Sequence, residues 1–216
     1  MTLAGVSVES GAADALLARF RALTGLQREL KGSRIGMGER GLFFELFAEA
    51  GARATVGIAI RAVRPGPGED RGDHDRDVYT ALLEDVIGAM LPESGGCLGV
   101  IIDDGRYDPA TLSSIRQDIG SLVAPLGVAS LDLSHHQAGL QIADVVANTF
   151  FNRALPSERQ GRLHALVEPL LESGRIKYRI LDRSVLDASA SPFASSEVER
   201  RPSVSTTLDT NGEKTA

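Results

Sequence analysis

The most apolar run of the chain, residues 97–102 (CLGVII), is the feature that most restricts the fold. Six consecutive apolar or small residues are typical of a β-strand that is covered on both faces, as in a sheet between layers of helices. Further strands are predicted at residues 3–8, 55–63, 128–133 and 176–181. Amphipathic helices are predicted between them, at residues 12–23, 39–50, 78–91, 109–123, 137–153 and 158–171. This alternation predicts an α/β fold whose sheet is at least partly parallel.

Several residues are expected to set the ends and faces of these elements. Ser10 is a plausible N-cap for the helix at 12–23, whose buried face would carry Leu16, Leu17, Phe20 and Leu23. Asp108 and Pro109 are suited to the cap and first position of the helix at 109–123. The segment 64–77, rich in proline, glycine and charge, is predicted to be a surface loop.

The length of 216 residues favours one domain with a single sizeable core. That domain is expected to cover residues 1–182. Residues 183–216 are rich in Ser, Thr, Asp, Glu and Pro and contain few large apolar side chains, so they are predicted to form a disordered tail.

Composition narrows the class of protein. A net charge of −6 argues against a simple nucleic-acid coat protein, but not against an enzyme that holds a phosphodiester through metal ions. The sole cysteine, Cys97, excludes an intrachain disulfide and fits a reducing compartment. No run reaches the roughly 18 to 20 apolar residues of a membrane span, and the N-terminus has no secretion signal. We therefore expect a cytoplasmic protein with no membrane partner.

Asp103 is the first candidate for chemistry, because it follows the most apolar strand directly. Ligands of open α/β sheets gather beyond the carboxyl ends of the strands, and a half-desolvated carboxylate there suits a metal ion. The alternative is that Asp103-Asp104-Gly105 simply begins a loop.

A polar stripe on the helix at 137–153 is the second candidate. Gln137, Gln141, Asp144 and Asn148 are spaced by 4, 3 and 4 residues and therefore share one helix face. Solvent-facing stripes usually carry Lys, Arg or Glu, whereas these short groups suit hydrogen bonds in a partly enclosed cleft. The alternative is an amphipathic helix with an unusual solvent face.

Glu29 and Lys31 are a third candidate pair. Residues two apart in an extended segment project to the same side, so an acidic ligand and a phosphate-steering cation would reach one cleft. Lysine is scarce, occurring otherwise only at Lys177 and Lys214. His135 and His136 precede the striped helix and are candidates for a general base or ligand, or simply polar residues at the helix start.

Three segments in this order carry a resemblance: Glu-Leu-Lys-Gly-Ser at 29–33, Val-Ile-Ile-Asp at 100–103 and Gly-Leu-Gln-Ile-Ala-Asp-Val-Val-Ala at 139–147. Over residues 3–181 the chain resembles the bacterial family catalogued as domain of unknown function 3800 (DUF 3800), whose members look like ribonuclease-H-type nucleases. The resemblance implies a ribonuclease-H-like mixed sheet flanked by helices. It also implies that Glu29, Asp103 and Asp144 bind Mg²⁺ or Mn²⁺ at a catalytic site with Lys31. Several members of that family travel with mobile elements or defence loci.

One departure from the family pattern affects activity. The family opens with a strand that ends in Asp-Glu-Ser-Gly, whereas this chain has Val8 in place of the aspartate before Glu9-Ser10-Gly11. If the resemblance holds, we expect the first predicted strand to correspond to the second strand of the family and the strand carrying the leading aspartate to be missing. The expected function is a metal-dependent nuclease or phosphodiesterase, weakened or inactive without that strand.

Two alternatives to the nuclease stay open. One is a non-catalytic remnant of the same fold that binds nucleic acid or a partner protein. The other is a small-molecule α/β enzyme that uses Asp103, although no glycine-rich phosphate loop supports it.

Overall fold

A computed structural model describes residues 1–9, 11–59, 68, 70–91, 98–104, 107–124 and 126–181. Its elements, in chain order, are β1 (Thr2–Ser7), α1 (Ala12–Thr24), the 3₁₀ turn η1 (Gly32–Arg34), α2 (Met37–Glu49), β2 (Arg53–Ala59), α3 (Arg71–Met90), β3 (Leu98–Asp103), α4 (Pro109–Val123), β4 (Gly127–Asp132), α5 (Ala138–Ala154), α6 (Gln160–Glu172) and β5 (Ile176–Leu181). Helices and strands alternate, and the α/β class predicted from the sequence is confirmed.

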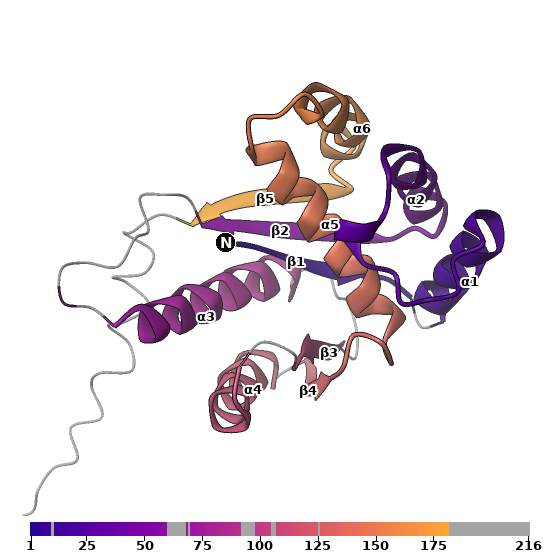
Figure 1. The fold of residues 1–216 in the computed structure, drawn as a ribbon. Helices are drawn as coiled ribbons and strands as arrows, with labels where there is room; N and C mark the ends of the chain where they lie inside the picture. Colours follow the sequence, from indigo (N-terminus) through magenta and orange to yellow (C-terminus); the bar gives the residue numbers. More distant parts are fainter. Residues whose placement is uncertain are drawn as a thin grey trace, which may run out of the picture.

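The strands form two sheets rather than one (Figure 1). In the first, of order β1-β2-β5, β1 pairs with β2 antiparallel and β2 pairs with β5 parallel. In the second, β3 pairs with β4 parallel. The first sheet is mixed, and the predicted parallel portion is present in both.

The helices cover these sheets from two sides. Helix α3 packs against β1 and β2, α4 packs against β4, and α5 crosses over β1, β2 and the end of β3 (Figure 1). Two strand glycines allow α3 to approach closely. A Cβ at Gly5 would lie 2.8 Å from Val86 Cγ1, and one at Gly57 would lie 2.8 Å from Leu82 Cδ2. Larger residues at these positions would push α3 away from the sheet.

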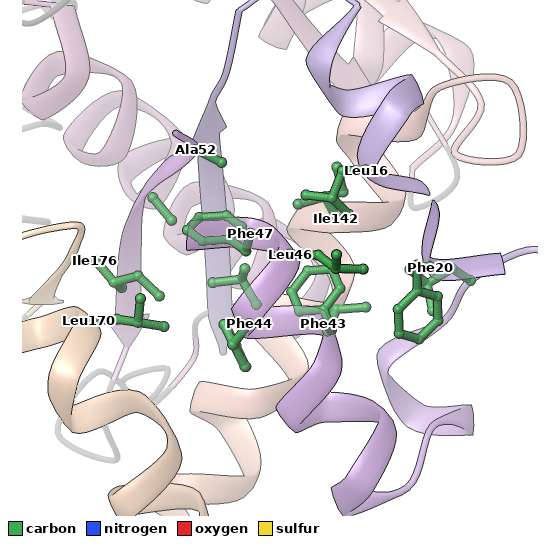
Figure 2. Packing of buried hydrophobic residues seen from close by; sticks show 14 of the residues in the cluster. Leu16, Phe20, Phe43, Phe44, Leu46, Phe47, Ala52, Ile142, Leu170 and Ile176 are labelled. Carbon is green, nitrogen blue, oxygen red and sulfur yellow. The ribbon is translucent and has the colours of Figure 1, made fainter. Parts of the chain in front are cut away.

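The main core lies between the first sheet and helices α1, α2, α5 and α6. Helix α2 contributes Phe43, Phe44 and Phe47, whose rings meet mostly edge to face, with centroids 5.1 to 6.2 Å apart. Figure 2 shows Phe44 and Phe47 on the side of Leu170 and Ile176, and Phe43 on the side of Phe20. Edge-to-face aromatic pairs add to the stabilisation that comes from burial alone.

The structure corrects one prediction about where an element begins. The segment 64–77 is not all loop, because α3 begins at Arg71 with Asp70 as its cap; the Asp70 side chain accepts hydrogen bonds from the amides of Gly72 and Asp73. The sequence-based boundary gave too much weight to glycine and charge and too little to the capping aspartate. Helix α1, by contrast, begins at Ala12 as predicted, after Gly11 at φ 80°.

Two predictions about burial are also wrong. Strand β3 is covered on one face only: Ile102 is 3% exposed, whereas its neighbour Ile101 is 41% exposed. Helix α4 packs against the Ile102 side. On α1, Leu16, Leu17 and Phe20 are buried as expected, but Leu23 is 58% exposed.

Other expectations hold or fall outside the described residues. Asp108 caps α4 as predicted, accepting hydrogen bonds from the amides of Ala110 and Thr111. Ser10, Cys97 and the predicted tail at 183–216 lie outside the described residues. Among the helices that the structure describes, none has the length and hydrophobicity required to cross a membrane.

Candidate functional site

Residues 28–34, here called the 28–34 segment, lie against α5 through backbone hydrogen bonds. The amide of Leu30 donates to Gln141 Oε1 at 2.9 Å, and the amide of Gly32 donates to Asp144 Oδ2 at 2.6 Å. The Leu30 side chain is fully buried. Because a buried amide without a partner is costly, Gln141 and Asp144 specify where this segment lies.

A buried arginine from α2 completes this attachment. Arg40 is 6% exposed and donates to Thr149 Oγ1 at 2.6 Å, to Asn148 Oδ1 at 2.7 Å and to the carbonyl oxygen of Gly32. Burial lowers the pKa of Arg40, and Asp144 opposes this effect. The guanidinium therefore links α2, α5 and the 28–34 segment, with Asp144 as the nearby compensating charge.

The polar stripe of α5 is thus explained by contacts within the chain. Gln141 is 2% exposed and also donates to the carbonyl oxygen of Ser134, while Gln137 donates to Asp132 Oδ2 at 2.6 Å. The stripe does make hydrogen bonds in an enclosed place, as predicted. Its partners are backbone and side-chain groups of the chain itself, and it is not a solvent face.

Glu29 and Lys31 do project to the same side, as their spacing predicts. Lys31 Nζ lies 2.9 Å from Glu29 Oε1 and 2.9 Å from Ser134 Oγ, and the Ser134 hydroxyl donates to Glu29 Oε1 at 2.6 Å. Burial alone would raise the pKa of Glu29, but the hydrogen bonds from Ser134 and Lys31 outweigh it, and the pKa is lowered. Ser134 is therefore a third member of this cluster.

A cavity of about 380 Å³ opens beside this cluster. Its lining consists of Arg21, Ala22, Leu26, Gln27, Arg28, Glu29 and His135. Arg21 contacts Gln141 Oε1 through Nη2 at 3.4 Å, and its Nε is buried without a hydrogen-bond partner. Since Lys31 neutralises Glu29, the two arginines leave this cavity with a positive charge. Arg21 and Arg28 gave no sequence signal, because arginines on a helix and in a loop are ordinary surface residues.

Three aspartates, Asp103, Asp104 and Asp132, lie close together at the carboxyl ends of the paired strands β3 and β4. Asp103 is opposite Asp132, and the Asp104 amide donates to the Asp132 carbonyl oxygen at 3.2 Å. Hydrogen bonds from Gln137, the Leu133 amide and His136 lower the pKa of Asp132. Asp103 is exposed, whereas Asp104 Oδ1 is buried and has no hydrogen-bond partner.

The metal-binding set that the resemblance implies is not assembled by the described residues. Asp144 is occupied by the Gly32 amide, and Glu29 by Lys31 and Ser134. Across the described ranges, no group of three or more His, Cys, Asp or Glu side chains is placed to hold a metal ion. The shared metal role of Glu29, Asp103 and Asp144 therefore stays a prediction from the sequence.

The two histidines before α5 differ in their surroundings. His135 lines the cavity, whereas the Nδ1 atom of His136 lies 3.3 Å from Asp132 Oδ1. Their rings are adjacent, with centroids 3.9 Å apart. Of the two, His135 is the one placed to meet a ligand in the cavity.

In comparisons with known proteins, no family model, no curated protein and no solved structure matches this chain. The resemblance to the DUF 3800 family therefore stays a prediction from the sequence.

Proposed function

We propose that this chain is a non-catalytic nucleic-acid-binding domain that holds a phosphodiester backbone in the cavity beside Glu29. The observation that carries this proposal is the charge of the lining: Arg21 and Arg28 line the cavity, and its single carboxylate, Glu29, is already paired with Lys31. Guanidinium groups bind phosphate oxygens through two parallel hydrogen bonds, which makes arginine a preferred phosphate ligand.

The charge of the whole chain favours contact with a few phosphates of the nucleic acid over contact with a long stretch of its backbone. The chain carries a net charge of −6, so a basic cavity stands out against an acidic surface. A protein of this kind contacts few phosphates, and its affinity should decrease with salt with a correspondingly shallow slope. The described carboxylates do not form the predicted metal set, so the proposal contains no cleavage step.

Binding is tested with a fluorescently labelled single-stranded oligonucleotide and the full chain, by fluorescence anisotropy at several salt concentrations. Arg28→Ala should weaken binding about tenfold and reduce the salt slope by about one, the effect expected for loss of one phosphate contact. Arg116→Ala is the matched control, because Arg116 is exposed on α4 and does not line the cavity. Equal affinities for the two variants, or no binding at low salt, would contradict the proposal.

Metal-dependent cleavage of the bound strand is a second proposal, which one observation favours. Asp104 Oδ1 is buried without a partner at the carboxyl end of β3, and an anionic oxygen in that position is stabilised by a cation. This would give the ribonuclease-H-like nuclease that the resemblance implies, with Mg²⁺ or Mn²⁺ held near Asp103 and Asp104.

The second proposal has its own readout. A metal that binds only the folded chain stabilises it by about 2.7 kcal/mol at a hundredfold excess over Kd. Millimolar Mn²⁺ should therefore raise the melting temperature of the parent chain, and Asp104→Asn should remove most of that rise. If Mn²⁺ leaves the melting temperature of the parent unchanged, cleavage through this site is excluded.

A further inference from the structure

The cavity beside Glu29 holds more positive charge than one internal phosphate of a strand can balance. Arg21, in the last turn of α1, and Arg28 both line it, and the carboxylate of the lining is paired with Lys31. An internal phosphodiester carries a single negative charge. If such a group entered the cavity alone, one of the two arginines would keep an uncompensated charge.

The Arg21 side chain has hydrogen-bond donors to spare. Its Nη2 atom contacts Gln141 Oε1 at 3.4 Å, a long distance for a hydrogen bond, and that oxygen already accepts from the Leu30 amide at 2.9 Å. In the described part of the chain, the Arg21 Nε atom is buried without a partner. A buried donor in this state costs free energy, which a ligand with an acceptor oxygen would recover.

The Arg28 side chain is free as well. It is exposed, and it makes no hydrogen bond or ion pair within the described residues. His135 also lines the cavity and can donate to a ligand, because even a neutral imidazole has one ring N–H. The cavity therefore combines two guanidinium groups with a further donor around one volume.

A phosphate at the end of a strand matches these groups better than an internal one. A phosphomonoester carries about −1.5 to −2 charges at pH 7 and has three acceptor oxygens. Two guanidinium groups can each bind a different pair of those oxygens. A carboxylate supplied by the chain itself would have one charge and two oxygens, so it would leave one arginine unbalanced.

We propose that the cavity binds the phosphorylated end of a nucleic-acid strand, a terminal phosphomonoester, in preference to an internal phosphodiester. End recognition rests on the proposed nucleic-acid binding and specifies which part of the strand enters the cavity. The volume of about 380 Å³ lies near the lower end of the range for small-molecule sites, which suits one terminal nucleotide. Ala22 and Leu26 form the apolar part of the lining, against which its sugar or base can lie.

The test compares three single-stranded oligonucleotides of one sequence whose 5′ end bears a hydroxyl, a phosphate or a methyl phosphate. The methyl phosphate is the matched control, since it has the single charge and the two free oxygens of a phosphodiester. With a fluorophore at the 3′ end, anisotropy should show that the full chain binds the phosphate end about tenfold more tightly than either other end, the effect of about one added charged hydrogen bond. The same three groups are also placed at the 3′ end, and a preference at either end meets the prediction.

Substitutions locate the preference in the cavity. Arg21→Gln and Arg28→Gln should each reduce the tenfold ratio to about twofold or less, because one guanidinium then remains for the phosphate. Arg116→Gln should keep the full ratio, since Arg116 is exposed on α4 and does not line the cavity. If Arg21→Gln does not fold, Arg28→Gln alters an exposed side chain and serves the same purpose.

The possible failures are distinguishable. Equal affinity for the three ends would overturn end recognition and leave the proposed nucleic-acid binding in place. A ratio that survives in the variants of Arg21 and Arg28 would also overturn it, because the end would then bind elsewhere. Displacement of the oligonucleotide by a nucleoside 5′-monophosphate at the same Kd would make a free nucleotide the ligand instead of a strand. If no oligonucleotide binds at low salt, end recognition and the proposed function are both wrong.

Discussion

Replacement of Gly32 by alanine tests whether the 28–34 segment is held against α5 as the structure shows. A Cβ at this position would lie 2.6 Å from Asn148 Cβ, 2.8 Å from the Asp144 carbonyl oxygen and 3.0 Å from Val145 Cα. These atoms belong to the framework of α5, so no side-chain rotation relieves the clash. The 28–34 segment must therefore move away from the helix.

The magnitude follows from what that movement breaks. Loss of the Leu30 hydrogen bond to Gln141 costs about 1 kcal/mol, and loss of the Gly32 hydrogen bond to the charged Asp144 costs about 2 kcal/mol. Partial exposure of the Leu30 side chain adds about 1 kcal/mol. We expect Gly32→Ala to lower the free energy of unfolding by about 3 to 4 kcal/mol, measured by urea denaturation of the full chain.

Gly41→Ala is the matched control. Gly41 lies inside α2, and a Cβ there meets no atom within 4 Å, so alanine should stabilise the chain by up to about 1 kcal/mol through helix propensity. If Gly32→Ala and Gly41→Ala have the same stability, the close approach of the 28–34 segment to α5 is refuted.

Three further predictions use other contacts. Because the pKa of Glu29 is lowered below its usual 4.5, the ionised form stabilises the fold above that pH. Ser134→Ala should therefore melt lower than the parent at pH 7, with a difference that shrinks as the pH falls through the lowered pKa. Burial and then Asp118 raise the pKa of Glu84, so the ionised carboxylate weakens the fold at neutral pH. Glu84→Gln should therefore raise the melting temperature at pH 7 but not at about pH 3, where the parent is already protonated. Asp70→Ala removes the cap of α3 and should cost about 1 kcal/mol in urea denaturation; no change would mean that α3 does not begin at Arg71.

The elements of the fold were largely predictable, because hydrophobic periodicity and capping act locally. The strand at 176–181 and the helix at 109–123 have their predicted bounds, and the α5 helix differs by one residue at each end. Burial was less predictable. The apolar run at β3 does not show which of its faces a helix will cover, since that depends on where α4 and α5 lie in space.

The candidate site was predictable only in its chemistry. The short polar groups of α5 signalled enclosed hydrogen bonding, which is what Gln141 and Asp144 do. Their partners are backbone amides near residue 31, over 100 positions away, and no sequence pattern marks an amide as a future donor. Arg40 was missed for a related reason, because a helical arginine is usually exposed and its burial depends on acceptors that include Asn148 and Thr149, over 100 positions away.

The attachment of the 28–34 segment to α5 also has a consequence for the order of events during synthesis. The contacts joining Leu30 to Gln141 and Gly32 to Asp144 span 111 and 112 residues. A ribosome adding about 5 to 20 residues per second needs several seconds to make that interval. Throughout that time the 28–34 segment, which contains Glu29 and Lys31, cannot make its contacts with α5, because α5 has not yet been synthesised. Closing so long a loop is also entropically unfavourable until both ends are held by other structure. The cavity that we propose as the ligand site is therefore completed late, after α5 has emerged and packed on β1.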